Sequence, residues 1–501
     1  MRSLPDLLAK RADLSPGAIA FRSLATGATV TYPALDAAAG RAAALMRQAG
    51  VAAGDRVAIL CRNRIEFFEV LFGCARIGAI LAPLNWRMPP EELGPLLQLT
   101  TPSLILFGGE DEAAARAIAG DMRRIGFDDP GPAGYRALGQ ATAPLAGRRE
   151  WPVDEVWYLL FTSGTTGRPK AVINTYGMAM VNAINIGSGI GLTGADRTAS
   201  FLPLFHAGGI GLHVLPTLFA GGKVIMLPGL DVDGLIDLIR KAELDTVFAV
   251  PAIYLQLSLH PAFDQLDLAS VRHWGCGGAP LPDTLLARYV ERGAIVCNGM
   301  GMTETGPTMF LMDRDRVQDK IGSVGKPQML AEARIVDVDG RDVAPGAVGE
   351  LWFGGAGITP GYWSDPAANA AAFSPCGWLK SGDLARQDEE GYFFIAGRSK
   401  EMFISGGENV YPAEIENVLA GHPQVAEAAV IGVADERWGE VGRAYVTLRA
   451  EEGVTCADLE RWCRIRLAGY KAPKTFVVVA DLPRNALGKV LKHRLVELDP
   501  P

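Results

Sequence analysis

The densest group of potential ligands in the chain lies in a loop that follows an apolar segment. Residues 158–161 (YLLF) predict a buried strand. Glycines after it allow backbone N–H groups to approach phosphate oxygens, while hydroxyls and an ammonium group add further donors. We therefore predict a phosphate-binding loop rather than a flexible hydrophilic surface loop, formed by Thr162, Ser163, Gly164, Thr165, Thr166, Gly167 and Lys170.

This loop differs from a Walker A loop in its spacing. Gly164 and Gly167 are too close together, and Ala171 rather than Ser or Thr follows Lys170. Residues 171–175 (AVINT) also predict an extended segment, where a Walker A loop would continue into a helix. The loop therefore indicates another class of nucleotide-binding protein.

Three further positions carry groups that suit nucleotide chemistry. Thr303 and Glu304 place a hydroxyl beside a carboxylate, and oxygen ligands are what Mg²⁺ prefers. The same pair is also typical of an exposed first helical turn. Asp383 follows a Ser-Gly pair at a predicted turn, where an aspartate is often only a cap. Lys489 lies in a loop before a helix expected at 490–492, and by itself it would be an ordinary surface lysine.

These positions belong to a longer ordered set of motifs. Along the chain the set is PLFH (203–206), GGAPL (277–281), NGMGMTE (298–304), GEL (349–351), GYW (361–363), SGD (381–383), GRSK (397–400) and PRNALGK (483–489). Together with the phosphate loop, this order resembles the acyl-adenylate-forming superfamily, which includes acyl-CoA synthetases, luciferases and the adenylation domains of peptide synthetases. The resemblance covers nearly the whole chain.

The resemblance implies an ATP-dependent acid–CoA ligase. Such an enzyme forms an acyl-adenylate with release of pyrophosphate, then passes the acyl group to the thiol of coenzyme A with release of AMP. ATP, Mg²⁺ and coenzyme A would be required, with Glu304 as a metal ligand. A peptide-synthetase module is disfavoured because no carrier domain follows the last motif. The motifs do not exclude a luciferase, whereas a non-catalytic nucleotide sensor would not need Lys489.

The same resemblance assigns the remaining residues of the adenylation site. The catalytic set would be Lys489, which bridges the acid carboxylate and the α-phosphate, together with Thr303, Glu304 and His206. His206 would lie beside the carboxylate without transferring a proton. ATP would also be bound by Gly277, Gly278, Ala279, Pro280, Asn298, Gly299, Met300, Gly301 and Met302, with Asp383 and Arg398 on the ribose.

The second half-reaction would use a small C-terminal domain that rotates about a hinge at Lys400. The coenzyme A site would then include the glycine-rich loop with Ser405, Gly406 and Gly407. Lys471 and Lys474 would contact the phosphates of coenzyme A, although both are equally well explained as surface lysines.

Two positions depart from the pattern of the family. Met300 stands where the family usually has an aromatic residue against adenine, and methionine offers a polarisable contact of weaker geometry. Ala171 stands where the family usually has glycine. A left-handed backbone at Ala171 would be strained by about 1 kcal/mol or more.

The sequence specifies the acid poorly. The expected acyl pocket contains no carboxylate or arginine, which disfavours amino and dicarboxylic acids, and its glycines would leave room for a long tail or a ring. We therefore expect a fatty acid of medium or long chain, with an aryl or arylpropenoic acid as the alternative. The pocket would be lined by Phe205, Gly208, Gly209, Leu212, Phe248, Val250, Gly275, Gly277 and Thr308.

The elements that must position these residues follow an α/β pattern. Strands and helices alternate, as in an apolar strand at 57–61 and a helix at 65–77 closed by Gly78, which predicts sheets rich in parallel strands. Later, short segments separated by Asp-Gly and Pro-Gly turns predict a β-rich subdomain. The expected division is a large domain over 1–398, with the β-rich subdomain at about 335–397, and a small mobile α+β domain over 399–501.

Composition narrows the class of protein. A chain of 501 residues, 49% hydrophobic and 21% charged, is typical of a folded protein of several units. A net charge of −8 without a run of Lys or Arg gives no footprint for nucleic-acid binding. Its seven cysteines are scattered, and we find neither a signal peptide nor an apolar run of about 18 residues. We therefore expect a cytoplasmic protein that acts on a small carboxylic acid and could form a homodimer.

Overall fold

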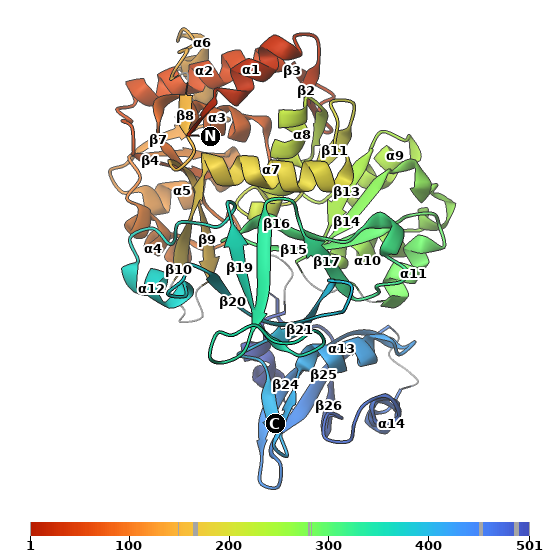
Figure 1. The fold of residues 1–501 in the computed structure, drawn as a ribbon. Coiled ribbons are helices and arrows are strands. Elements are labelled where there is room, and N and C mark those ends of the chain that lie inside the picture. The colour runs from red at the N-terminus through yellow and green to blue at the C-terminus, as the bar shows by residue number, and fades with distance from the viewer. Residues whose placement is uncertain are drawn as a thin grey trace.

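The computed structural model describes residues 2–148, 150–163, 169–278, 281, 283–449, 454–484 and 490–499. Over these residues the chain forms a large α/β part, and a small α+β part lies below it in Figure 1. The fold class predicted from the sequence is confirmed. Within the same ranges, no helix is both long enough and apolar enough to cross a lipid bilayer.

The first sheet is built by residues 56–175. Its strands are β4 (Arg56–Leu60), β5 (Ile80–Pro83), β6 (Leu104–Phe107), β7 (Arg123–Gly126), β9 (Val156–Ser163) and β10 (Pro169–Thr175). Among the described residues the order is β10-β9-β5-β4-β6-β7, parallel apart from β10 against β9. The surrounding helices include α2 (Tyr32–Gln48), α3 (Ile65–Ile77), α4 (Pro90–Thr100) and α5 (Glu112–Ala119). As predicted, α3 ends at Gly78, whose left-handed backbone (φ 72°) costs glycine little.

The second sheet has a parallel part and an antiparallel part. The parallel part consists of β2 (Ile19–Ser23), β11 (Arg197–Ser200), β12 (Lys223–Met226), β13 (Thr246–Ala249), β14 (His273–Cys276) and β15 (Val296–Met302), with β3 (Thr29–Thr31) antiparallel at its edge. The antiparallel part consists of β16 (Gly306–Leu311), β17 (Ser323–Pro327), β18 (Ala331–Val336), β19 (Gly349–Gly355), β20 (Leu379–Gln387) and β21 (Phe393–Arg398). Antiparallel strands therefore begin before residue 335.

The parallel part of the second sheet is covered on both faces. Apolar side chains of β13 and β14, such as Val247 and Trp274, pack into one core cluster with α9 (Val232–Arg240), α10 (Pro251–Leu259) and α11 (Asp283–Val290). The opposite face lies under α7 (Tyr176–Ile190), a π-helical turn η2 (Gly208–Leu212) and α8 (Val214–Ala220), which Figure 1 draws in yellow and yellow-green. The expected acyl site belongs to this second face.

The small C-terminal part has its own sheet and core. The sheet consists of β22 (Phe403–Ser405), β23 (Glu408–Val410), β24 (Val425–Asp435), β25 (Gly439–Leu448) and β26 (Thr475–Val478). Two helices, α13 (Pro412–Ala420) and α14 (Cys456–Arg466), pack on it through residues such as Ile415 and Leu459. The helix expected at 490–492 differs in position, because Val490 bridges to Arg484 and a 3₁₀ helix covers Lys492–Leu498. Shorter elements elsewhere are β1 (Ser3–Pro5), α1 (Leu7–Leu14), α6 (Tyr135–Gln140), β8 (Glu150–Pro152) and α12 (Pro366–Ala372).

Candidate active site

Glu304 lies in the turn between β15 and β16, and only 8% of the residue is exposed. The hydroxyl of Tyr362 donates a hydrogen bond to its Oε1 atom at 3.0 Å. The backbone N–H of Thr359 donates to the carbonyl oxygen of Glu304 at 2.8 Å. Thr303 and Glu304 are therefore not an exposed helix start, the alternative that the sequence left open. The carboxylate is buried and held in one orientation.

Lys170, a residue of β10 in the first sheet, places its side chain beside the Tyr362 ring. Its Nζ atom lies 4.6 Å from the centre of the Tyr362 ring, within the range of a cation–π contact. The segment carrying Tyr362 is bound to β10, because the N–H of Ile173 donates to the carbonyl of Gly361 at 3.1 Å. In return, the N–H of Trp363 donates to the carbonyl of Ala171 at 2.8 Å. The strand β10, which follows the predicted phosphate loop, is thereby joined to the residue that orients Glu304.

Tyr362 keeps its proton in this position. Burial raises the pKa of its hydroxyl well above the ordinary tyrosine value, and the neighbouring carboxylate of Glu304 adds to the rise. The hydroxyl is therefore a permanent donor to Glu304.

The backbone strain considered for Ala171 is not found. Ala171 is an extended residue of β10 that pairs with Phe161 and is fully buried beside Leu159. Among the described residues other than glycine, positive φ angles occur at Thr101, Ala242 and Ser364 only. The methyl group of Ala171 is therefore an ordinary core contact.

Asp383 and Arg398 face each other across the strand pair β20–β21. Arg398 Nε lies 2.6 Å from Asp383 Oδ1, and 6% of the aspartate side chain is exposed. The turn before Asp383 is fixed by Ser381, whose hydroxyl accepts from the N–H of Asp383 at 2.9 Å and donates to the carbonyl of Leu351 at 2.6 Å. Glu350 accepts a further bond from the N–H of Gly382 at 3.2 Å. The motifs at 349–351, 381–383 and 397–398 thus form one local structure.

The expected adenine-binding segments meet at the ends of β14 and β15. A Cβ atom on Gly277 would lie 2.9 Å from the carbonyl oxygen of Gly299, so the two backbones approach closely. Gly278 has a left-handed backbone, with φ 81°. Met300 and Met302 pack against the core cluster of the antiparallel part, while Asn298 and Gly301 are partly buried beside them. Thr162 pairs with Lys170 across β9 and β10.

Several predicted site residues lie outside the part of the chain that the structure describes. They are Gly164, Thr165, Thr166 and Gly167 of the phosphate loop, Ala279, Pro280 and Lys489, and the side chain of Ser163 is likewise not described.

His206 lies in the loop after β11, with its ring centre 4.4 Å from that of Phe205. Its Nε2 atom is buried and has no hydrogen-bond partner among the residues that the structure describes. Burial lowers the pKa of His206 to about 3, and the nearby Arg87 contributes. The imidazole is therefore neutral at physiological pH.

The glycines of the expected acyl pocket do not all provide free room. A Cβ atom on Gly275 would lie 2.8 Å from Phe248 Cδ2, and one on Gly277 would lie 3.0 Å from Phe248 Cζ. The absence of side chains at these two glycines therefore allows the ring of Phe248 to pack closely against them. Gly209 faces its own loop, since a Cβ there would meet the carbonyl oxygen of Pro203. Of the other predicted lining residues, Leu212 and Thr308 are buried, and Gly208, Phe248 and Val250 are partly exposed.

The expected coenzyme A loop is the turn of the hairpin β22–β23. Gly406 and Gly407 have positive φ angles of 62° and 89°, and Ser405 is buried. Trp438 packs against Gly406, since a Cβ there would lie 2.8 Å from Trp438 Cε3. Lys474 is exposed, with its Nζ 5.9 Å from the centre of the Trp438 ring. Lys471 differs, because both carboxylate oxygens of Glu414 accept bonds from it at 2.8 Å.

Lys400 follows the last strand of the second sheet and precedes the first strand of the small sheet. On one side of it, the N–H of Ser399 donates to the carbonyl of Gly382 at 2.9 Å. On the other side, Glu401 pairs with Lys492 at 2.8 Å, and Lys492 also pairs with Glu416 of α13. The chain is therefore anchored to the large part before Lys400 and to the small part after it.

Sequence reasoning overlooked three functional candidates. Tyr362 was visible within a recognised motif, but its contact with Glu304 depends on the pairing of distant segments. His213 and His273 carry buried Nε2 atoms without a partner among the described residues, and both lie near Phe248 and Gly275. The only sequence signal for them is the rarity of histidine, with six in the chain.

Comparisons with known proteins agree with this geometry. The model of the AMP-binding enzyme family matches residues 8–363, and that of the AMP-binding enzyme C-terminal domain matches residues 414–489. A feruloyl-CoA synthase from Amycolatopsis sp is 40% identical over 486 residues, which are 96% of each chain. The long-chain-fatty-acid–CoA ligase FadD13 from Mycobacterium tuberculosis is 34% identical over 505 residues, covering 99% of this chain and 98% of the relative. The solved structure of o-succinylbenzoate coenzyme A synthetase (MenE) from Bacillus subtilis, in complex with ATP and magnesium ion, superposes with a TM-score of 0.89 at 32% identity, covering 99% and 100% of the two chains.

Proposed function

The chain belongs to the AMP-binding enzyme family and is an AMP-forming acid–CoA ligase, and we propose that its acid is an aryl or arylpropenoic acid. The reaction uses ATP with Mg²⁺ and coenzyme A as co-substrate. The observation that carries the choice of acid is the 40% identity to a feruloyl-CoA synthase over 96% of both chains. Ferulic acid is an arylpropenoic acid, which the sequence alone left as the alternative to a fatty acid.

The position of the Phe248 ring also favours an aromatic acid. Its ring lies over Gly275 and Gly277 on the second sheet and is partly exposed there. An aryl group that stacks against it or meets its edge would gain about 0.5–1.5 kcal/mol beyond the burial of its apolar area. An aliphatic tail would gain only the burial.

Asp383 and Arg398 would hold the ribose of ATP. A carboxylate that is fixed by its own turn can accept hydrogen bonds from two neighbouring hydroxyls, and the guanidinium of Arg398 orients it. Met300 would contact the adenine, since alternation along β15 directs its side chain away from the face of Gly275. Lys170 and Thr162 would reach the phosphates beside the loop.

Glu304 fits a ligand of Mg²⁺. Mg²⁺ usually takes one or two carboxylates together with substrate phosphates and water, and Glu304 is a single buried carboxylate of that kind. Bound Mg²⁺ would offset part of the negative charge of the phosphates. The hydroxyl of Tyr362 keeps the carboxylate in place, and Lys170 brings a cation to the same region.

Two half-reactions would share this site through rotation at Lys400. Lys489 would act first, because a fixed ammonium stabilises the charge that develops when a carboxylate attacks a phosphate. The turn at Gly406 and Gly407 would then approach the acyl-adenylate with coenzyme A. Anchoring of Ser399 to the large part and of Glu401 to the small part supports Lys400 as the pivot.

A fatty acid of medium or long chain is the second candidate. The 34% identity to the long-chain-fatty-acid–CoA ligase FadD13 over 99% of this chain favours it.

A substrate panel separates the two candidates. CoA-dependent AMP release is measured with acetate, octanoate, palmitate, benzoate and coumarate, and a reaction without coenzyme A serves as the blank. We expect kcat/KM for coumarate or benzoate to exceed that for octanoate and palmitate by about tenfold or more, the usual scale of discrimination by one group in a substrate pocket. The reverse order would support the fatty acid and reject the aryl acid.

A further inference from the structure

Two buried histidines lie on one face of the second sheet without a described function. His213 is 5% exposed and His273 is 6% exposed, and their ring centres are 6.2 Å apart. The Nε2 atom of each ring has no hydrogen-bond partner within the described ranges of the chain. Buried polar atoms are nearly always bonded, so each of these atoms points to a partner other than the residues that the structure describes. Ser200 Oγ and Thr246 Oγ1 lie on the neighbouring strands β11 and β13, and they too are buried without a hydrogen-bond partner among the described residues.

Strand geometry places these groups on the face of the expected acyl site. Side chains alternate along a strand, so His273 and Gly275 of β14 point the same way, and Thr246 and Phe248 of β13 pair with them. Trp274 and Cys276 point the other way, into the core beneath α9 and α10. A Cβ atom on Gly275 would lie 3.2 Å from His273 Nε2. The histidine nitrogen is thus directed at the place where the glycine lacks a side chain.

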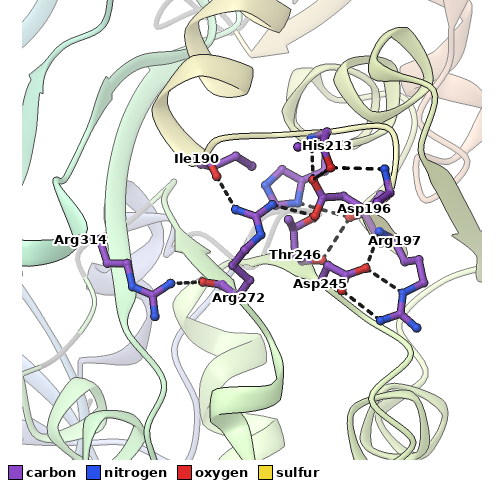
Figure 2. Close-up of polar contacts among 11 residues, drawn as sticks. Ile190, Asp196, Arg197, His213, Asp245, Thr246, Arg272 and Arg314 are labelled. Atoms are coloured by element: carbon purple, nitrogen blue, oxygen red, sulfur yellow. Dashed lines mark hydrogen bonds and ion pairs between the residues drawn. The ribbon is translucent and has the colours of Figure 1, made fainter.

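The face ends just beyond the two histidines. Where β11, β13 and β14 begin, Arg272 pairs with Asp196 at 2.7 Å, and Arg197 pairs with Asp245 at 2.7 Å; Asp196, Asp245 and Arg272 directly precede the three strands. Figure 2 shows these ion pairs with His213 and Thr246 beside them. Because the guanidinium groups already have carboxylate partners, they close the end of the face and offer no site for a second carboxylate.

Both imidazoles are neutral. Burial lowers the pKa of His213 to about 4 against the opposing effect of Asp196, and burial, His213, Arg272 and Arg314 lower that of His273 to about 3. His213 Nδ1 lies 3.3 Å from the hydroxyl of Thr198, which donates to the carbonyl of Thr246. Nδ1–H of His213 then donates to Thr198, and its Nε2 is left as an acceptor. A hydroxyl group can donate to that atom and still accept from His273.

We propose that His213 and His273 bind a hydroxyl group at the far end of the acid and so select hydroxylated aryl acids over unsubstituted ones. This inference rests on the proposed aryl acid–CoA ligase function. His273 begins β14 and Gly277 directly follows it at the adenylate end of the face, so the two are four residues apart, which is roughly 13 Å at a rise of 3.3 Å per residue. That span suits one ring joined to the carboxyl group through a short chain. Acetate would not reach the histidines, and a long alkyl chain would meet the ion pairs behind them.

The test compares matched acids. For the wild type, the ratio of kcat/KM for 4-hydroxycinnamate to kcat/KM for cinnamate should be about tenfold or more, as expected for one hydrogen bond to an otherwise unpaired buried group. The ratio should fall towards one in His273→Phe and in His213→Phe, while kcat/KM for cinnamate is kept or rises. His273→Gln, which retains a polar group, should recover part of the ratio. His260→Phe is the matched control, because His260 contacts Asp233 at the edge of α9 and should leave the ratio unchanged.

A wild-type ratio near one overturns the proposal, even if the phenylalanine variants fail to fold. So does an unchanged ratio in both folded phenylalanine variants. If only alkanoates are substrates, the proposed function falls by itself, and the same variants are then tested with octanoate and 8-hydroxyoctanoate. A hydroxyl preference there that depends on the histidines would reject the aryl part of the proposal and keep the histidines as the hydroxyl site, and its absence would reject both.

Discussion

Replacing Tyr362 with phenylalanine tests whether its hydroxyl orients Glu304, the proposed magnesium ligand. The change removes one hydroxyl, which donates to Glu304 Oε1 at 3.0 Å, and keeps the ring that lies 4.6 Å from Lys170 Nζ. A hydrogen bond to a buried charged group contributes about 1.5–3 kcal/mol. Loss of a bond that orients a metal ligand typically costs about 10- to 100-fold in metal affinity or activity. These two magnitudes agree, because a factor of ten corresponds to about 1.4 kcal/mol.

The assay is acid-dependent release of pyrophosphate at a series of magnesium concentrations. In Tyr362→Phe we expect the magnesium concentration for half-maximal rate to rise and kcat/KM for ATP to fall about 10- to 100-fold. Thioester formation from pre-made acyl-adenylate should change much less, because that step no longer transfers the adenylyl group. Tyr392→Phe is the matched control: the hydroxyl of Tyr392 donates to the carboxylate of Asp313 at 2.6 Å, away from this cluster.

Two results would refute the reasoning. An unchanged magnesium dependence in Tyr362→Phe would mean that the hydroxyl does not orient the metal ligand. An equal loss in Tyr392→Phe would mean that removal of any tyrosine–carboxylate bond disturbs the fold enough to explain the effect. Thermal unfolding of both variants, measured in parallel, shows whether the loss of stability is the same.

Three further variants test the two half-reactions and the adenine contact. Lys489→Ala should lower adenylate formation about 10²- to 10³-fold and spare thioester formation from pre-made adenylate, and an equal loss in both steps would reject its role. Lys400→Pro should block overall turnover, because proline fixes φ and prevents the rotation between the two half-reactions. Adenylate should still form if the locked protein rests in the adenylate-forming state. Normal turnover in this variant would place the pivot elsewhere. Met300→Tyr should lower KM for ATP by up to about tenfold and leave KM for the acid unchanged. A shift in KM for the acid alone would place Met300 at the acyl group.

The sequence could predict those parts of the site that depend on local patterns. Asp383 and Arg398 lie in short motifs that the family resemblance assigned to one site, and the structure pairs them at 2.6 Å across β20 and β21. The extended run after Lys170 was predicted because its residues are apolar and β-branched, and β10 confirms it.

Contacts between distant segments could not be predicted in the same way. The bond from Tyr362 to Glu304 exists because Gly361 and Trp363 pair with β10, about 190 residues earlier in the chain, and no local pattern encodes that pairing. The backbone strain considered for Ala171 could not be judged from the sequence for the same reason, since pairing with Phe161 of β9 sets its backbone conformation. The contact between Gly275 and the ring of Phe248 could not be predicted either, because that ring belongs to the neighbouring strand β13.

Placement along the strands explains why the reaction was easier to infer than the acid. The groups proposed for adenylate chemistry follow the carboxyl ends of β14 and β15, at Gly277 and at Thr303–Glu304, where α/β sheets commonly bind ligands. The groups near the far end of the acyl face, His273 and Thr246, begin the same pair of strands β14 and β13. A substitution at His273 can therefore alter the preferred acid while the turn that holds Glu304 keeps its bond to Tyr362. The motifs shared across the superfamily describe only the residues at the carboxyl ends of these strands. The residues where the strands begin were found because their buried polar atoms have no partner among the described residues.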